Sequence, residues 1–467
     1  MKSYPLQFPY GQFRGWDSGG GQWPDIEICR AASGDPSDPC FDWTNFDTQM
    51  AELNQAGVND IFYTLSRTPL WAVNTTGDPT GQNGTECDYY AAGTTSLSLA
   101  AGQCLIPVDL NADGSGSNQI WKNWVAAIAT RVNDPVYVQT HAHVKYWEPW
   151  NEFHRSSTLI NYVGQQSYEG TYAQLVRMTE DLRCIVTGKG VIHNFPAAGS
   201  ITNCASTPID ANAEIVAPSS GPTNGLYATQ NFLYCNATGK NAPPASAKCT
   251  TGSAGSQAVD IINEHLYALF VTPETVASKH IPGVRAILQS ADLSKPFING
   301  EGSWGNVTKP NVIWTDPYAR AGFIPRYFAL NWSAGVTMNI WYGYDDIYIG
   351  GLYDPDTAQP FQPAASAWSL TYNWLAGAQP AHNPFCSSSG TVYTCDFAEA
   401  SGTAAELVWD AQYGQNCSQM ENPIICGSTA YTVPSQFHKD WVDLKGDVHT
   451  VSSNVTIGAN PILLEGQ

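Results

Sequence analysis

Residues 146–153 read Tyr146-Trp147-Glu148-Pro149-Trp150-Asn151-Glu152-Phe153. The stretch has the aromatic composition of a buried strand, but it ends in two carboxylates with a side-chain amide directly before the second. Burying an ionisable carboxyl without a partner costs several kcal/mol, so polar groups at the end of such a strand are expected to face a functional site.

A second stretch of the same kind reads Pro296-Phe297-Ile298-Asn299-Gly300-Glu301-Gly302-Ser303-Trp304. It is again a short apolar run that leads to a single glutamate. If both strands belong to one barrel, their carboxyl ends meet at its functional face. We therefore expect Glu152 and Glu301 to face each other across one cleft.

The composition limits the kinds of partner. At 467 residues the chain is long enough for one large domain and a smaller one. Charged residues make up 13% of it and aromatic residues 12%, which is typical of a loop-rich extracellular globule. The net charge of −20 argues against a nucleic acid, an anionic membrane surface or a strongly acidic polymer as partner. The simplest role of the acidity is to keep a secreted protein soluble.

The cysteines and sequons indicate a secretory route. The twelve cysteines form near-neighbour pairs that we expect to be local disulfides: Cys29/Cys40, Cys87/Cys104, Cys184/Cys204, Cys235/Cys249, Cys386/Cys395 and Cys417/Cys426. None has the spacing of a zinc site, so no metal is predicted there. Sequons begin at Asn74, Asn83, Asn236, Asn306, Asn331, Asn416 and Asn454. No signal peptide or membrane span is visible, and we expect a mature form with an added starting methionine.

Strand and helix patterns alternate as far as Gly377. Thr272-Pro273 and Asp316-Pro317 are typical helix starts, with a capping side chain before a proline. Such alternation predicts a parallel sheet with helical crossovers. Strands are expected near residues 8, 14, 61, 146, 192, 262, 298 and 338, and eight is the number that closes a barrel. The predicted fold class is therefore α/β, a (β/α)8 TIM barrel.

Past Gly377 the helical pattern gives way to short alternating strands separated by Gly, Asn and Pro. They are expected at 391–393, 405–409, 431–433, 441–444 and 462–464, and they predict a small C-terminal antiparallel β-sandwich. The predicted domains are residues 1–377, the barrel, and residues 378–467, the sandwich. Two aperiodic stretches, 74–117 and 200–255, are expected to be long loops that shape the cleft.

Residues 109–114 read Asp109-Leu110-Asn111-Ala112-Asp113-Gly114, which is the opening of a calcium loop. However, Ile120 stands where an EF-hand places its bidentate glutamate. This incomplete motif leaves two alternatives, a calcium site and a loop built from Asx turns, and it favours the second.

Unusual polar and aromatic side chains fall at the carboxyl ends of the predicted strands: Arg14, Asp17, Asn151, Glu152, His265, Tyr267, Glu301 and Trp341. Two glutamates among aromatic rings suit glycoside hydrolysis, in which one carboxylic acid protonates the leaving oxygen and one carboxylate attacks or supports the anomeric carbon. A carboxylate separation of about 5–5.5 Å gives retention of configuration, and a wider gap gives inversion. Trp and Tyr rings stack on the apolar faces of sugars.

At these residues the sequence resembles a known family. It looks like clan A of the retaining glycosidases on (β/α)8 barrels, and most like glycoside hydrolase family 39 with its bacterial exopolysaccharide-hydrolase branch. The resemblance covers residues 1–377. Residues 146–153 are similar to the family's Y-F-E-V-W-N-E-P strand. The resemblance implies that Glu152 is the acid/base and that Asn151 donates to the sugar 2-hydroxyl.

Two further strand ends carry the resemblance near the amino terminus. Arg14-Gly15-Trp16-Asp17 is similar to R-L-W-D, where Arg14 would sit near the nucleophile and hold it ionised. Thr68-Pro69-Leu70-Trp71-Ala72 looks like T-P-Q-W-A.

Later strands match as well. His265 and Tyr267 look like the family's sixth-strand histidine and tyrosine. The resemblance places Tyr267 near Glu301, the implied nucleophile, and Trp341 under the sugar. The sequence departs from the family at Phe153, which replaces a proline, and at residues 299–302.

Some assignments have alternatives. Glu148 competes with Glu152, because strand alternation places both on the same side, and only the resemblance favours Glu152. The other ambiguous residues are those that fit core packing as well as a site, namely His265, Tyr267, Trp71 and Trp304. His154 is a further candidate contact to the substrate.

The combined prediction is a secreted, monomeric, retaining glycosidase that cleaves an equatorial, β-type bond in an oligo- or polysaccharide. Glu301 attacks, and Glu152 first donates a proton to the leaving group and then activates water; Arg14 and Tyr267 should lower the pKa of Glu301. No metal or organic cofactor is required, and the partner is the carbohydrate substrate. The alternatives are a non-catalytic carbohydrate-binding barrel protein and an inverting hydrolase.

Overall fold

The computed structural model describes residues 9–17, 20–58, 60–73, 104–153, 168, 170–193, 201–204, 207–221, 225–235, 254–290, 293–308, 313–413, 427–437 and 439–466. The chain forms two compact units. The first contains Gly11–His265 and Ala286–Pro296, and the second contains Leu266–Arg285 and Phe297–Gln467. The predicted domain boundary at residue 377 lies within the second unit and stays a prediction.

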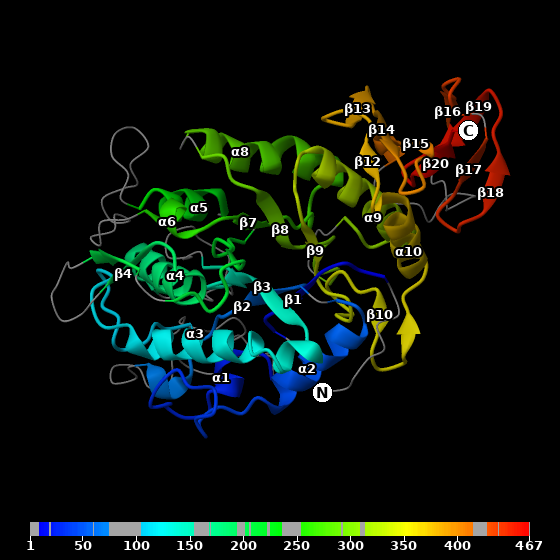
Figure 1. The fold of residues 1–467 in the computed structure, drawn as a ribbon. Helices are drawn as coiled ribbons and strands as arrows, with labels where there is room; N and C mark the ends of the chain where they lie inside the picture. Colours follow the sequence, from blue (N-terminus) through cyan, green and yellow to red (C-terminus); the bar gives the residue numbers. More distant parts are fainter. Residues whose placement is uncertain are drawn as a thin grey trace. The chain divides into compact units, whose positions relative to one another are not determined.

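The first unit is built on parallel strands (Figure 1). β1 (Phe13–Gly15), β2 (Asp60–Thr64), β3 (His143–Glu148) and β6 (Glu214–Ile215) pair in this order. Two parallel bridges, Val216 with Ile261 and Ser220 with Glu264, place β7 (Ile262–His265) beside β6. Strands that are neighbours in the chain are thus neighbours in space, as repeated βα units require.

Helices accompany these strands: α1 (Trp23–Ile26), α2 (Thr44–Gln55), α3 (Gln119–Val132), α4 (Tyr172–Thr187), α5 (Gly225–Leu233) and α6 (Gly255–Ala258), with 3₁₀ turns η1 (Leu70–Ala72) and η2 (Tyr137–Gln139). Stacked indoles fill the core beneath α1–α3, with the ring centroid of Trp124 5.8 Å from Trp23 and 6.2 Å from Trp43. α4 begins in a capping box made by Thr171 and Gln174.

One predicted strand is wrong. Residues 191–193 form β4 (Val191–His193), which pairs antiparallel with β5 (Ile201–Asn203) in a separate sheet. The strand that pairs with β3 on this side is β6, inside the stretch 200–255 that was expected to be a loop. β6 has only two residues, too few to show alternation, whereas Val191 and Ile192 have the β-branched composition of a strand. The strand expected near residue 8 lies outside the described residues.

The second unit contains two parallel strands, β8 (Phe297–Gly302) and β9 (Asn339–Trp341). The surrounding elements are α7 (Pro273–Thr275), the π-helical segment η5 (Val276–His280), α8 (Ile281–Ser290), α9 (Pro317–Ser333), the hairpin of β10 (Tyr353–Asp354) and β11 (Gln359–Pro360), and α10 (Ala364–Leu375). Both predicted helix starts are confirmed, because the side chains of Thr272 and Asp316 accept hydrogen bonds from the first turns of α7 and α9.

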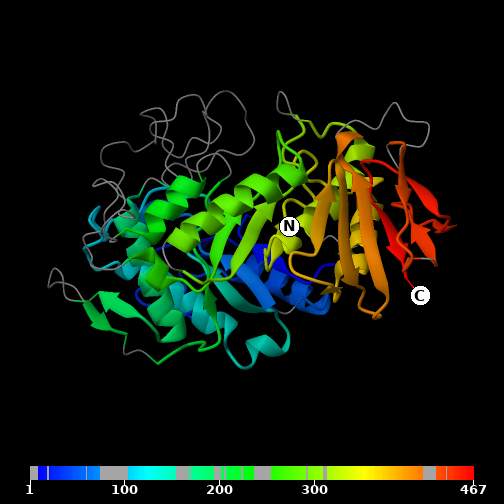
Figure 2. The same ribbon diagram turned by 90° about the horizontal axis from the view of Figure 1, so that it is seen from above.

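The carboxyl-terminal part is the expected antiparallel sheet, whose orange strands lie side by side in Figure 2. It contains β12 (Gln379–Pro380), β13 (Cys386–Ser389), β14 (Val392–Ala398), β15 (Ala404–Asp410), β17 (Asp440–Val442), β18 (Val448–Thr450) and β20 (Ile462–Glu465). A smaller sheet, β16 (Thr429–Thr432) with β19 (Asn454–Ile457), shares a buried core with it that includes Val408, Leu464 and Ile457.

A buried ion pair joins this sheet to the helices of the same unit. Arg326 of α9 donates two hydrogen bonds of 2.8 Å to Glu274, and the indole of Trp409 in β15 donates to the same carboxylate at 2.8 Å. Burial opposes ionisation of Glu274, but the Arg326 charge outweighs it and lowers the pKa of that carboxyl. The sheet is therefore an integral part of the second unit.

Three of the predicted disulfides lie among the described residues and are present: Cys29–Cys40, Cys184–Cys204 and Cys386–Cys395. Cys104 and Cys235 are also disulfide-bonded, and the remaining predicted partners, Cys87, Cys249, Cys417 and Cys426, lie outside the described residues. The sequon at Asn331 is fully buried in α9, so it is not a glycosylation site in the folded chain. None of the described helices is long and apolar enough to cross a lipid bilayer.

The loop at 109–117 is organised around an internal cation. Arg177 of α4 donates hydrogen bonds to three backbone carbonyls of the loop at 3.2–3.3 Å. Asp113 accepts from the backbone N–H of Ser115, which is an Asx turn, and Asp109 accepts from the first N–H groups of α3. These contacts favour the Asx-turn alternative over a calcium site. The Arg177 guanidinium already binds backbone carbonyl oxygens of the loop, and a calcium ion would use ligands of the same kind.

Candidate active site

Glu148, at the end of β3, is fully buried and surrounded by donors. The Arg14 guanidinium donates to one carboxylate oxygen at 2.6 Å, together with the hydroxyl of Thr64. The backbone N–H of Ser219 and the side-chain amide of Asn263 donate to the other oxygen, each at 2.8 Å. Glu148 therefore accepts hydrogen bonds from four segments of the first unit and holds them together.

The turn after Glu148 is fixed by the same neighbours. Arg14 also donates to the amide oxygen of Asn151 at 2.6 Å, which sets the orientation of that amide. The hydroxyl of Ser219 accepts the backbone N–H of Glu152 at 3.1 Å, and its carbonyl accepts that of Phe153 at 3.1 Å. Glu152 has φ of 45°, in the left-handed region that a residue with a side chain adopts only when its surroundings enforce it.

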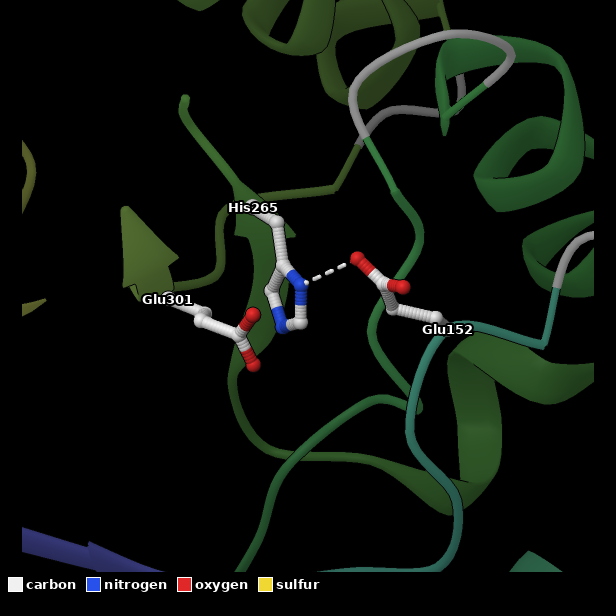
Figure 3. Close-up of side chains that lie close together, drawn as sticks. All are labelled: Glu152, His265 and Glu301. Atoms are coloured by element: carbon white, nitrogen blue, oxygen red, sulfur yellow. Dashed lines mark hydrogen bonds and ion pairs between the residues drawn. The ribbon is translucent and has the colours of Figure 1, made fainter. Parts of the chain in front are cut away.

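Glu152 is buried to 8% exposure and faces His265 at the end of β7 (Figure 3). The Oε1 of Glu152 lies 2.9 Å from the Nδ1 of His265, which is itself 2% exposed. The hydrogen bond can run either way, because a neutral histidine donates to a carboxylate and accepts from a protonated carboxyl. In contrast to Glu148, this glutamate keeps a partner in both protonation states.

Glu301, also labelled in Figure 3, belongs to the second unit. It stands at the carboxyl end of β8 and is 5% exposed. The hydroxyl of Tyr267, which is half-buried, donates to its Oε1. A hydroxyl that donates to a carboxylate favours the charged form.

The unusual sequence around Glu301 has a packing reason. Asn299 accepts the backbone N–H of Leu266 at 2.9 Å and donates to the hydroxyl of Tyr327 at 3.0 Å, so a polar side chain inside the strand is satisfied. The same tyrosine explains Gly302, because a Cβ there would lie 2.1 Å from the Tyr327 hydroxyl. Tyr327 therefore accounts for both Asn299 and Gly302 in this strand.

The three tryptophans predicted as substrate contacts differ in their exposure and in their hydrogen bonds. Trp341 is partly exposed, and its indole N–H donates to the carbonyl of Gly350 at 2.7 Å. Trp304 is only 1% exposed and packs edge-on against Trp341 with ring centroids 4.9 Å apart. Its burial favours the core-packing alternative, and its role as a substrate contact stays a prediction. Trp71 in η1 is partly exposed and donates to the carbonyl of Glu27 at 3.0 Å.

Of the remaining predicted residues, Asp17 lies at β1. Asp17 is exposed at the end of that strand. Trp16 lies between two guanidinium groups, 5.7 Å from Arg14 and 5.3 Å from Arg67, in cation–π contacts. His154 lies outside the described residues.

Two clusters result. In the first unit the structure brings together Arg14, Asn151, Glu152 and His265 around Glu148. In the second unit it joins Tyr267 to Glu301. The predicted contact of Arg14 with Glu301, and the separation of Glu152 from Glu301, stay predictions.

Ser219 was missed by sequence reasoning. It lies in a stretch without periodicity, and a serine carries no catalytic signal of its own. The available hint was the short apolar run 215–217 followed by two serines, which has the same form as the other strand ends. In the folded chain it is hydrogen-bonded to five residues of the stretch 148–153.

The fold defines a class: a mixed α/β protein with parallel strands and a carboxyl-terminal antiparallel sheet domain. Solved structures of this class match the chain. They include a conserved exported protein from Bacteroides fragilis, which is 11% identical with a TM-score of 0.54 and covers 99% of this chain and 89% of its own. A glucosidase from Croceicoccus marinus is 14% identical with a TM-score of 0.52, covering 92% of this chain and 83% of that one.

A third match is SrfJ from Salmonella typhimurium, which is 10% identical with a TM-score of 0.52 and covers 98% of this chain and 81% of that chain. No protein-family model matches the sequence, and a search of curated proteins gives no match. At these identities the likeness establishes a shared fold, and the resemblance to family 39 stays a prediction.

Proposed function

We propose that the protein is a retaining glycoside hydrolase on a (β/α)8 barrel, with Glu301 as nucleophile and Glu152 as acid/base. The observation that carries the proposal is the pair of hydrogen bonds His265–Glu152 and Tyr267–Glu301. His265 and Tyr267 are separated by a single residue, so their Cα atoms are at most about 7 Å apart. His265 is hydrogen-bonded to Glu152, and Tyr267 is hydrogen-bonded to Glu301. The short segment between His265 and Tyr267 supports the proposal that the two carboxylates meet at one sugar ring.

The surroundings of Glu152 and Glu301 suit the two steps of a double displacement. In the first step Glu152 gives its proton to the glycosidic oxygen while a carboxylate oxygen of Glu301 bonds to the anomeric carbon and the leaving group departs. In the second step Glu152 takes a proton from water, the water oxygen attacks the anomeric carbon, and Glu301 is released as carboxylate. Tyr267 favours the charged state of Glu301, and His265 can partner Glu152 before and after proton transfer.

The contacts of Glu148 support the choice of Glu152 as acid. Both carboxylate oxygens of Glu148 are occupied by hydrogen bonds from four donors, which gives this residue a structural role. Glu152 is the other candidate on this turn, and its backbone φ of 45° is the kind of local strain found at active sites. Arg14 holds the amide oxygen of Asn151. We propose that the amide nitrogen donates to the sugar 2-hydroxyl, as the resemblance implies.

The proposed substrate is a neutral oligo- or polysaccharide with an equatorial, β-type linkage, and the proposed setting is extracellular. The disulfides support an oxidising compartment. The likeness to a glucosidase structure supports the fold on which such chemistry occurs. We further propose that the protein acts as a monomer without a metal or organic cofactor.

The test is activity on aryl β-glycosides and neutral β-linked polysaccharides, comparing the wild type with Glu152→Ala and Glu301→Ala. We expect both variants to lose activity. Azide should restore turnover in Glu152→Ala with a β-glycosyl azide as product, because it attacks the glycosyl-enzyme, whereas any rescue of Glu301→Ala should give the α anomer by direct displacement. A matched control is Glu264→Gln, which alters a buried glutamate one residue from His265. Proton NMR of the first sugar released distinguishes retention from inversion. A wild type as inert as both variants across the panel would favour a non-catalytic carbohydrate-binding protein.

A further inference from the structure

Three segments of the second unit are joined by hydrogen bonds where β8 and β9 end. The backbone N–H of Ala268 donates to the carbonyl of Ser303 at 3.0 Å, so the segment 266–270 lies beside the segment after β8. The backbone N–H of Val307 donates to the carbonyl of Tyr348 at 3.0 Å, so the segment after β9 also lies beside the segment after β8. Glu301 directly precedes the residues of β8 and its following segment that make these contacts.

Two of these segments are held by buried or partly buried indoles. Trp314, which is fully buried, donates to the carbonyls of Ala268 and Val271 at 2.8 and 3.1 Å. Trp341 donates to the carbonyl of Gly350 at 2.7 Å. The carboxylate of Asp346 accepts the backbone N–H groups of residues 348 and 349 at 2.7 and 2.9 Å, which fixes the loop between Trp341 and Gly350.

Each fixed segment nevertheless presents a large apolar side chain to solvent. Phe270 is 46% exposed and Tyr348 is 53% exposed, with Ile347 beside it at 42%. Neighbouring exposed apolar side chains mark surfaces that bind ligands, and a fixed position lowers the entropy cost of binding. Their chemistry suits the C–H faces of pyranose rings.

We propose that Phe270 and Tyr348 form an aromatic rim on which sugar units of a neutral glycan stack beyond the unit that is hydrolysed. This rests on the proposed function, because the rim continues the strand end that carries Glu301. The neighbouring Asp345 is exposed, and the chain has a net charge of −20, so a chain of uronic acids would be repelled. The substrate class is therefore an extended neutral oligo- or polysaccharide and not a simple aryl monoside.

The first experiment measures kcat/KM for neutral β-linked oligosaccharides from disaccharide to hexasaccharide and for the matching aryl monoside. We expect the wild-type value to rise with chain length. In Tyr348→Ala and Phe270→Ala the ratio of hexasaccharide to monoside kcat/KM should fall about three- to tenfold for each lost ring. The control is Tyr372→Ala, because Tyr372 is an exposed aromatic residue on α10 and not on a strand-end loop; it should leave the ratio unchanged.

The second experiment measures binding of the hexasaccharide by calorimetry to Glu301→Gln and to the same variant carrying Tyr348→Ala. Weaker binding in the double variant would support the aromatic rim. If the wild type also turned over no substrate, the proposed hydrolase function would be overturned while the rim would stand. Wild-type turnover of the monoside, with equal ratios and equal hexasaccharide binding in all variants, would overturn the rim and keep the hydrolase. A shift of Tyr348→Ala from dimer to monomer in sedimentation, with glycan binding unchanged, would assign the rim to a second copy of the chain and also overturn it.

Discussion

The carboxyl ends of β3 and β8 both carry a glutamate, but they are built in opposite ways. At the end of β3, hydrogen bonds from Arg14, Ser219 and Asn263 converge on Glu148. Glu152 follows in the same turn and has a backbone φ in the left-handed region. The end of β8 is a run of small and amide residues that lets one tyrosine hydroxyl, Tyr327, pack against Gly302. The comparison shows two ways to place a glutamate at a strand end: the proposed acid/base follows a turn fixed by a charged network, and the proposed nucleophile stands in a strand shaped by close packing.

The largest expected effect separates the two glutamates by leaving group. Glu301→Gln should lower kcat by about 10⁴-fold or more on every substrate, because no covalent intermediate forms. Glu152→Gln should cost about 10²–10⁴-fold on alkyl glycosides and much less in the glycosylation step with nitrophenyl glycosides, whose leaving group departs without a proton. Pre-steady-state kinetics on both substrate types measures this. Equal losses for both variants on both substrates would contradict the assignment.

A second prediction contrasts Glu148 with Glu152 in stability. Glu148→Gln leaves the Arg14 charge buried without its carboxylate, so the free energy of unfolding should fall by about 3–5 kcal/mol. Glu152→Gln keeps one acceptor for His265 and should change it by less than about 1 kcal/mol. Urea unfolding followed by tryptophan fluorescence measures both values. If Glu152→Gln proved the more destabilising of the two, Glu152 and not Glu148 would be the structural carboxylate.

A third prediction concerns Glu264, next to His265. Burial raises the pKa of Glu264 to about 7, against the opposing effect of hydrogen bonds from Ser220 and Thr229. The unfolded chain binds fewer protons than the folded chain between about pH 4.5 and about pH 7, so this carboxyl costs stability as the pH rises through that window. The cost is about 3 kcal/mol once the pH exceeds about 7.

Glu264→Gln removes the titration, so the difference in unfolding free energy between wild type and variant should shift in favour of the variant from about pH 5 to about pH 8. Chemical denaturation at both values measures it. Asp113→Asn is a matched control at an exposed acid whose pKa is lowered by Ser115. A difference for Glu264→Gln that does not change with pH would contradict the raised pKa.

The smallest expected effect tests the packing beside Glu301. Gly302→Ala places a methyl group against the Tyr327 hydroxyl and should cost about 1–3 kcal/mol of stability while lowering kcat. Tyr327→Phe removes the clashing oxygen, so the double variant should recover part of both losses. Thermal unfolding and kcat for the four proteins of this cycle give the coupling. Additive losses would show that Tyr327 is not the constraint.

Much of the fold could be predicted because its signals are local. The strands at 143–148 and 297–302 and the helix starts at Thr272 and Asp316 follow from composition and capping patterns that a few adjacent residues carry. β6 could not be predicted, because two residues show no periodicity and its pairing partner β3 lies far away in the chain. Ser219 was missed for the same reason.

The same contrast between local signals and distant contacts holds for the candidate site. Glu152 and Glu148 are indistinguishable by alternation along a strand, and only the donors brought from β1, β2, β7 and residue 219 mark Glu148 as the structural one. At Trp304 the sequence left a sugar platform and core packing open, and its burial favours core packing.

By itself the sequence determined the α/β class, the local disulfide pairs that are described, and the set of strand ends that carry acidic and aromatic side chains. These depend on residues close together in the chain, whose preferences need no distant partner. Only the tertiary structure decided which glutamate is saturated with donors, which tryptophan is covered and which short segment completes the parallel strands. Those outcomes depend on burial and hydrogen bonding between segments that no local pattern connects.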